Sequence, residues 1–284
     1  MHKLCRYVFL LLLALSAQSA EAAETSPLKP LEIGVVPYMS ARVLITSYEP
    51  MRQYLEQTLG RPVKIFTAAG FKPFFLGAQH GDYDLVVTAA HFARILQKEN
   101  NFTPLVRYSS GGRGLVMTNL DSRIHTAQDL KGKIIALPDQ LSLASIVCMT
   151  HLNEAGLKPG RDFRLLEVPS FASAILSLQK GDADAAVSAP GALVQMTNEM
   201  RDSVRPVVDT GEYVNLIILS HPRLEKKLSG LLGNALLKFG NTTGEGKQFL
   251  ASTGFGSIIP VTPKDMNNLD RYTPETKRLL DLTH

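Results

Sequence analysis

FASAILSLQKGDADAAVS, the stretch from Phe171 to Ser188, repeats in register the pattern of FKPFFLGAQHGDYDLVVT, from Phe71 to Thr88. The identical residues pair as Phe71/Phe171, Gln79/Gln179, Gly81/Gly181, Asp82/Asp182, Asp84/Asp184 and Val87/Val187. Each copy predicts a helix of about ten residues that ends at the glycine, then a Gly-Asp-x-Asp turn, then a short apolar strand.

This duplication predicts the architecture of the whole chain. A helix followed directly by a strand is typical of α/β structure, and repetition at this spacing predicts two similar α/β halves. A cleft between two such halves is where a small ligand would bind. The alternative is that two independent α/β units share a common turn by chance.

Residues 1–23 have the pattern of a secretory signal peptide. Lys3 and Arg6 form a basic start, Tyr7–Leu15 is apolar but too short to span a bilayer, and Ala17–Ala23 offers small residues for cleavage. Cys5 precedes the apolar run rather than following it, so no lipid anchor is expected. The mature protein is therefore predicted to be periplasmic.

Composition argues against some classes of function. The net charge of +4 becomes about +3 without Lys3, Arg6 and Glu21 of the leader, because two positive charges and one negative charge are lost. Basic residues are spread along a chain without Trp, so nucleic-acid binding has little support. Cys148 is the single cysteine after the leader, which excludes an intramolecular disulfide, and its apolar neighbours predict a buried, inert thiol.

Strand and helix signals alternate along the chain and predict two lobes. Lobe I comprises residues 28–112 with 217–284, and lobe II comprises residues 113–216. The chain is expected to cross between the lobes at the Gly-rich stretch Ser109–Gly114, where glycine gives conformational freedom. It is expected to return at Tyr213–Leu219.

Three further local predictions concern helices. Tyr38–Ser47 is predicted to be a loop and Tyr48–Leu59 an amphipathic helix that ends at Gly60. A helix is expected over about Gly191–Met200. The last helix is expected over Thr273–Leu282.

Four short motifs occur in the order found in one protein family. They are Ile33–Pro37 (IGVVP), Gly81–Val86 (GDYDLV), Asp129–Lys133 (DLKGK) and Gly181–Asp184 (GDAD). By these motifs the chain resembles the periplasmic solute-binding proteins of phosphate/phosphite/phosphonate-type (PhnD-like) ABC transporters. The resemblance implies a periplasmic-binding-protein fold of type II, in which two α/β lobes joined by two crossing strands close on a small solute.

In α/β sheets, ligands bind beyond the carboxyl ends of the strands. This rule selects the loops after the predicted strands, where the candidate ligand-binding residues are Tyr38, Ser40, Thr88, His91, Ser142, Ser145 and Ser188. Ser142 precedes a predicted helix and Ser145 lies three residues further on. Both hydroxyls and several helix amides can therefore converge on an anion.

Each of these candidates has a structural alternative. Ser142 can be an ordinary helix N-cap. His91 can be a solvent-exposed or helix-capping residue, and Arg113 can pair with an acid at the surface. The aspartates of the two repeat turns are expected to bind backbone amides rather than to take part in catalysis.

The resemblance adds three more candidates. It implies that Phe71 replaces a hydroxyl-bearing aromatic residue, Phe171 replaces a ligand histidine, and Asn215 replaces a carboxylate. Phosphonate-binding members carry Ser-Thr-Ser-Gly where this chain has Ser142–Ser145 (SLAS). The missing hydrogen bonds predict weaker phosphonate binding through the family's residues. Phe71 and Phe171 are alternatively part of the lobe cores.

The sequence contains no known catalytic or cofactor motif and no metal-ligand spacing, so no catalysis, cofactor or metal is predicted. The interpretation is a monomeric periplasmic protein that captures a small, anionic solute by hinge closure and delivers it to the membrane permease of an ABC transporter. Two alternatives stay open. The closed form can signal to a membrane sensor kinase, or a catalytic group can converge in the cleft and make the protein an enzyme.

Overall fold

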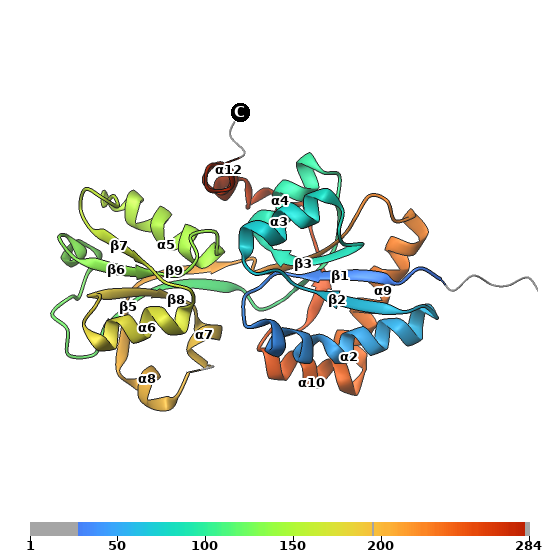
Figure 1. Cartoon of the computed structure of the whole chain (residues 1–284), viewed down its shortest axis with the longest axis horizontal. Coiled ribbons are helices and arrows are strands. Elements are labelled where there is room, and N and C mark those ends of the chain that lie inside the picture. Colours follow the sequence, from blue (N-terminus) through green and yellow to red (C-terminus); the bar gives the residue numbers. More distant parts are fainter. Residues whose placement is uncertain (1–27, 195, 282–284) are drawn as a thin grey trace, which may run out of the picture.

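Two mixed β-sheets, each flanked by helices, form the protein (Figure 1). The computed structural model describes residues 28–194 and 196–281. The predicted signal peptide at residues 1–23 lies outside these ranges. The two sheets with their helices, called the first half and the second half below, lie side by side along the longest axis of the molecule (Figure 1).

The first sheet contains six strands. In spatial order they are β11 (Ile258–Pro260), β4 (Thr103–Tyr108), β10 (Leu216–Ser220), β3 (Leu85–Ala89), β1 (Leu31–Val35) and β2 (Val63–Phe66). Its helices come from both ends of the chain. They are α2 (Ala41–Leu59), α3 (Phe71–His80), α4 (Ala90–Glu99), α9 (Lys226–Thr242), α10 (Gly244–Thr253), α11 (Pro263–Asn267), η2 (Asp270–Tyr272) and α12 (Thr273–Leu280).

The second sheet contains five strands from the middle of the chain. In spatial order they are β7 (Arg164–Glu167), β6 (Ile134–Leu137), β8 (Ala185–Ser188), β5 (Gly112–Asn119) and β9 (Val204–Tyr213). Its helices are η1 (Ala127–Leu130), α5 (Leu143–Glu154), α6 (Phe171–Lys180), α7 (Pro190–Val194) and α8 (Asn198–Asp202).

The duplication is present in the topology. Strands β2-β1-β3 are parallel neighbours in the first sheet, and β7-β6-β8 are parallel neighbours in the same order in the second. An antiparallel strand follows each set, and it reaches its sheet from the other half of the chain: β10 beside β3, and β5 beside β8. The predicted α/β class with two crossing connections is therefore confirmed.

The two repeat turns make the same hydrogen bonds. Asp84 donates its N–H to the Glu32 carbonyl at 2.8 Å, and its carboxylate accepts from the Glu32 N–H at 2.9 Å. Asp184 makes the same exchange with Ile134, also at 2.8 and 2.9 Å. Each turn thus fastens the start of the third parallel strand to the central one, and both aspartates bind amides as expected.

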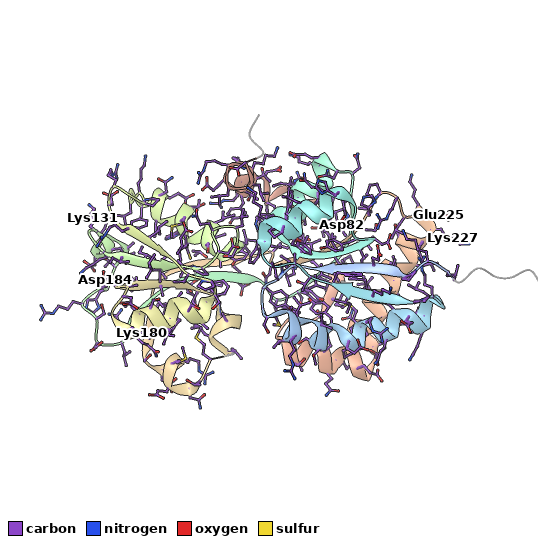
Figure 2. The ribbon with its side chains drawn as sticks, in the orientation of Figure 1. Asp82, Lys131, Lys180, Asp184, Glu225 and Lys227 are labelled. Atoms are coloured by element: carbon purple, nitrogen blue, oxygen red, sulfur yellow. The ribbon has the colours of Figure 1, made fainter. Side chains whose placement is uncertain are left out.

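The glycine of each turn is required by its backbone conformation. Gly81 and Gly181 end α3 and α6 with φ of 81° and 79°, in the left-handed region where a Cβ atom is strained. Figure 2 shows Asp184 at the end of the second half that is farthest from the first half. The strand that follows it therefore runs toward the junction between the halves.

The hydrophobic core extends across the junction. The cluster that contains Phe74, Phe75 and Phe92 of the first half also contains residues on and just before α5 of the second half, namely Leu141, Leu143, Ile146 and Val147. Two further clusters cover the opposite faces of the second sheet. Burial of these apolar side chains fixes the start of α5 against the first half.

Some local predictions were wrong. Helix α2 begins at Ala41, so the segment Tyr38–Ser47 is mostly helical rather than a loop. The helix expected over Gly191–Met200 is two short helices, α7 and α8. The chain does pass between the sheets within the Gly-rich stretch, at residues 109–111, but β5 already begins at Gly112, which pairs with Tyr213 on β9.

Candidate functional site

The candidate residues sit where strands end at the junction. Strand β3 ends at Ala89 and leads directly into α4, while β6 leads into α5 through residues 138–142. Strand β8, parallel to β6, ends at Ser188. Because parallel strands end at the same edge of their sheet, the segments after β6 and β8 meet at one edge of the second sheet.

Ser142 and Ser145 form a hydrogen-bonded pair at the start of α5. The Ser142 hydroxyl accepts from the Ser145 N–H at 3.1 Å and donates to the Ser145 hydroxyl at 2.7 Å. Ser142 is thus a helix N-cap, as its structural alternative predicted. The hydroxyl hydrogen of Ser145 is left free to donate, and its side chain is buried, with 1% of the residue exposed.

His91 is fully buried, which excludes the structural alternative of a solvent-exposed histidine. Its Nε2 lies 2.9 Å from the carbonyl oxygen of Leu141, the residue before Ser142. Burial lowers the pKa of His91 to about 3, although the hydrogen bond to Leu141 opposes part of this shift. The imidazole is therefore neutral at pH 7 and ties the first half to the second.

Thr88 and Ser188 carry buried hydroxyls that have no hydrogen-bond partner among residues 28–194 and 196–281. Thr88 lies in β3 opposite Ile217, one residue before the end of the strand. Ser188 is the last residue of β8. A buried polar atom without a partner costs free energy, so each hydroxyl has a hydrogen bond that the described residues leave unmade.

The two phenylalanines pack as core residues. The Phe71 ring lies 6.3 Å from the Phe92 ring, centre to centre, and it is partly buried against the core of the first half. Phe171 is partly buried against a cluster of the second half. Their structural alternative therefore accounts for the contacts of both.

Tyr38, Ser40 and Asn215 lie in three different surroundings. The Tyr38 hydroxyl lies 3.5 Å from that of Tyr48, and burial raises the pKa of Tyr38, so its phenol stays protonated. Ser40 precedes α2, is exposed and makes no capping hydrogen bond. The Asn215 carbonyl accepts from the N–H of Ala90 at 2.8 Å, which holds the return segment against the start of α4.

The structure therefore brings together part of the predicted set. Thr88, His91 and Asn215 gather where β3 meets α4, and Phe71 contacts the adjacent Phe92. His91 joins this group to Ser142 and Ser145 through Leu141. No hydrogen bond within the described ranges links Tyr38, Ser40 or Phe171 to that group.

Two contributors were missed from the sequence. The Leu141 carbonyl receives the His91 hydrogen bond, but any residue type supplies a carbonyl, so no sequence signal marks it. Arg94 binds Asp270 through two hydrogen bonds of 2.8 Å and fixes the C-terminal segment onto α4. Arg113 pairs with Asp209 at the surface, as its alternative predicted, with the two atoms 3.1 Å apart.

A family model described as an ABC transporter, phosphonate, periplasmic substrate-binding protein matches residues 33–266. The chain belongs to this family. The resemblance read from the sequence motifs is thereby confirmed. The family is periplasmic and its members work with the membrane permease of an ABC transporter, as predicted.

Solved structures of similar fold support the same architecture for this binding protein. A binding-protein component of an ABC phosphonate transporter from Pseudomonas aeruginosa is 16% identical, with a TM-score of 0.77 and coverage of 88% of this chain and 87% of the other. PhnD1 from Prochlorococcus marinus, in complex with methylphosphonate, is 18% identical, with a TM-score of 0.75 and coverage of 90% and 99%.

A third solved structure is that of an alkanesulfonate-binding protein. The alkanesulfonate-binding protein SsuA from Xanthomonas axonopodis pv. citri, bound to MOPS, is 20% identical, with a TM-score of 0.61 and coverage of 90% of this chain and 95% of the other. Because these structures are only 16–20% identical to this chain, their similarity establishes the fold alone. This binding protein has the type II periplasmic-binding-protein fold that the motifs implied.

Other chemistry has little support in the part of the chain that the structure describes. There, no group of three or more His, Cys, Asp or Glu side chains is placed to hold a metal ion. Burial raises the pKa of the Cys148 thiol, so the thiol is inert as expected. None of the helices between residues 28 and 281 is both long and apolar enough to cross a bilayer.

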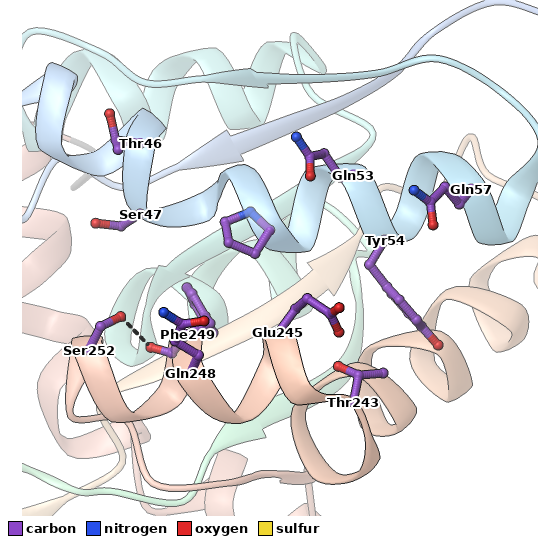
Figure 3. A pocket seen from close by; sticks show the side chains of 11 residues that line it. Thr46, Ser47, Gln53, Tyr54, Gln57, Thr243, Glu245, Gln248, Phe249 and Ser252 are labelled. Atoms are coloured by element: carbon purple, nitrogen blue, oxygen red, sulfur yellow. Dashed lines mark hydrogen bonds between the residues drawn. The ribbon is translucent and has the colours of Figure 1, made fainter.

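Two cavities lie away from the candidate residues. One of about 530 Å³ lies between α2 and α10 (Figure 3), and another of about 530 Å³ lies between β4, the return segment and η2. Glutamine amides and hydroxyls face the first, where Ser252 donates to the Phe249 carbonyl at 2.9 Å. None of the candidate residues lines either cavity, although Val214 of the second cavity is the chain neighbour of Asn215. Both cavities are therefore separate from the candidate site.

Proposed function

We propose that this binding protein captures a small oxyanion at the junction of its two halves and delivers it to the membrane permease of an ABC transporter. The observation that carries the proposal is the pair of buried, unpartnered hydroxyls, Thr88 and Ser188, one from each half. A solute that accepts from both would bind the two halves together, which stabilises the closed form.

The start of α5 supplies the positive potential. The first amides of this helix point toward its N-terminus, where the helix dipole favours an anion. The free hydroxyl hydrogen of Ser145 adds a further donor. Neutral donors of this kind bind an oxyanion without placing a buried positive charge against it.

Hinge closure is the proposed mechanism. The proposed hinge lies where the chain passes between the sheets, at residues 109–111 and 214–215, close to the lobe boundaries predicted at 112/113 and 216/217. The solute binds the closed form more tightly than the open form and shifts the population toward it. The proposed partner is a permease, because the matching family is one of ABC transporters, and a sensor kinase is the alternative partner.

A thermal-shift screen tests the class of solute. Phosphate, phosphonates, sulfonates and small carboxylates are added to the protein, and light scattering checks the predicted monomeric state. A solute at about a hundred times its Kd stabilises the folded protein by about 2.7 kcal/mol. Phosphonates are the leading probes, because a structural relative was solved with methylphosphonate. The proposal would be contradicted if no oxyanion raised the melting temperature, or if the protein chemically converted any of them.

Two matched serine variants test the site. Ser145→Ala removes the free hydroxyl but keeps the N–H that Ser142 caps, so the Kd of the responding oxyanion should rise at least about tenfold. The control is Ser173→Ala on α6, where Ser170 and Ser173 form the same N-cap pair at an exposed position. Its Kd should equal that of the wild type in isothermal titration calorimetry. Equal Kd values for Ser145→Ala and the wild type would place the solute elsewhere.

A further inference from the structure

His91 has one ring nitrogen in use and one free. Nε2 faces the Leu141 carbonyl at 2.9 Å, whereas the buried Nδ1 has no hydrogen-bond partner within residues 28–194 and 196–281. A carbonyl oxygen accepts hydrogen bonds and cannot donate them, so Nε2 must carry a hydrogen. In a neutral imidazole the other nitrogen then has none, and Nδ1 is an acceptor.

This acceptor differs from every other free group in the candidate site. The hydroxyls of Thr88 and Ser188 can rotate to donate or to accept, and the helix amides and Ser145 donate. Nδ1 can do nothing but accept. It is one ring atom away from the nitrogen that contacts Leu141, which precedes the Ser142–Ser145 pair.

The charged groups around His91 are engaged elsewhere. The ion pairs on its own helix and on the elements packed against it are Arg94 with Asp270, Lys98 with Asp270, Lys277 with Glu99, Arg271 with Glu154, Lys72 with Asp281, Arg107 with Asp265 and Arg278 with Glu275. The Asp139 carboxylate, on the segment before α5, accepts from the Leu141 N–H at 2.8 Å. None of these groups donates to Nδ1, which is left as a buried acceptor without a donor among the described residues.

We propose that His91 determines the specificity of this site by accepting a hydrogen bond at Nδ1 from a protonated oxygen of the solute. The site then selects oxyanions that keep one O–H group, such as a hydrogen phosphonate, over sulfonates of the same shape, which carry none. The inference depends on the proposed function, because it assigns a role within the same oxyanion site. A sulfonate leaves the acceptor unpaired and buried, which costs free energy.

Methylphosphonate and methanesulfonate are the probes that test it, because they match in shape and differ in the O–H group. In isothermal titration calorimetry at neutral pH, the wild type should bind methylphosphonate at least about tenfold more tightly than methanesulfonate. As the pH is raised above neutrality, the phosphonate loses its last proton. Its affinity should then fall toward that of the sulfonate, whose own affinity stays constant.

Two variants separate the ring nitrogens. The amide nitrogen of a glutamine reaches the position of Nε2, so His91→Gln keeps the bond to Leu141 and loses the acceptor at Nδ1. The oxygen of an asparagine reaches the position of Nδ1, so His91→Asn keeps the acceptor and loses the bond. The preference for methylphosphonate should shrink to within about twofold in His91→Gln and persist in His91→Asn.

The outcomes distinguish this inference from the function on which it depends. If neither probe binds the wild type, the proposed oxyanion site is wrong and the role of His91 falls with it. If both probes bind equally, or if His91→Gln keeps the wild-type preference, the oxyanion site stands and the role of His91 is overturned. Circular dichroism of both variants confirms that the comparison is between folded proteins.

Discussion

His91 should make the stability of the protein depend on pH. Its pKa is about 3 in the folded protein and about 6.5 in an unfolded chain. Above about pH 6.5 the ring is neutral in both states, and its contribution to stability is fully present. As the pH falls from about 6.5 toward 3, the unfolded chain takes up a proton that the folded protein does not, so stability is lost, by up to about 1.4 kcal/mol per pH unit.

Urea unfolding at a series of pH values between neutral and about pH 4 measures this loss. In His91→Gln, which cannot take up that proton, the free energy of unfolding should fall less steeply over the same range. His151→Gln on the exposed side of α5 is the matched control, and it should follow the wild type. Parallel curves for wild type and His91→Gln would show that His91 does not carry the dependence.

The residues of the site differ in how far the sequence predicts them. Ser142 could be predicted as an N-cap because a cap depends on the next three residues, and those are local. The burial of His91 depends on Leu141, fifty residues further along the chain. A local pattern says nothing about such a contact, which is why the alternative of an exposed position stayed open. Thr88 and Ser188 were selected as candidates because they lie at the carboxyl ends of predicted strands, and not because of their side-chain types.

The two copies of the repeated turn should contribute differently to stability, because their aspartates have different charged neighbours. Asp84 is buried and receives a hydrogen bond of 2.7 Å from Arg223, while Asp184 is more exposed and lies 3.6 Å from Lys133. Asp84→Asn should therefore lower the free energy of unfolding by about 1–3 kcal/mol, because the Arg223 guanidinium loses its charged partner. Asp184→Asn should cost less than about 1 kcal/mol.

Urea unfolding of the two variants, measured side by side, checks this difference. Each asparagine keeps an oxygen for the backbone amide that the aspartate binds, so the turn itself is preserved in both. Equal losses would mean that the amide contact, and not the ion pair with Arg223, dominates the role of Asp84.

Helices and strands were predicted well where the sequence shows a periodic apolar pattern. They were predicted poorly where tertiary contacts decide where an element begins. The repeat helices and their glycine ends were found because apolar spacing and a left-handed glycine are local signals. The first turns of α2 were missed, because Val43 and Ile45 are exposed there and Pro50 follows inside the helix. The start of β5 was missed because its glycines are ordered by their pairing with β9.

Besides the hydrogen bond from His91 to Leu141, the two halves are held together in three ways. Two chain segments cross between the sheets, the start of α5 packs into the core of the first half, and Arg271 on η2 pairs with Glu154 on α5 at 3.2 Å. The ion pair is exposed and contributes little. The duplication predicted two halves and a cleft, but the packing of α5 across the junction joins residues far apart in sequence and could not be predicted from either repeat.

The crossing of β5 and β9 should be intolerant of added volume. A Cβ atom on Gly112 would lie 2.2 Å from the Tyr213 ring, which is far inside contact distance. Gly112→Ala should therefore force the two strands apart and lower the free energy of unfolding by about 1–3 kcal/mol. Because these strands join the halves, the Kd of the responding oxyanion should rise as well, and the radius of gyration measured by X-ray scattering should fall less on adding that solute.

Two further variants decide whether the Tyr213 ring is the cause. Adding Tyr213→Ala to Gly112→Ala removes the ring, so the double variant should be more stable than the sum of the single changes predicts. Gly230→Ala on α9 is the matched control, because a Cβ atom there meets nothing within 4 Å and replaces a helical glycine, which should stabilise the protein by up to about 1 kcal/mol. Additive losses in the double variant would show that strand pairing itself, rather than the Tyr213 ring, sets the geometry of the hinge.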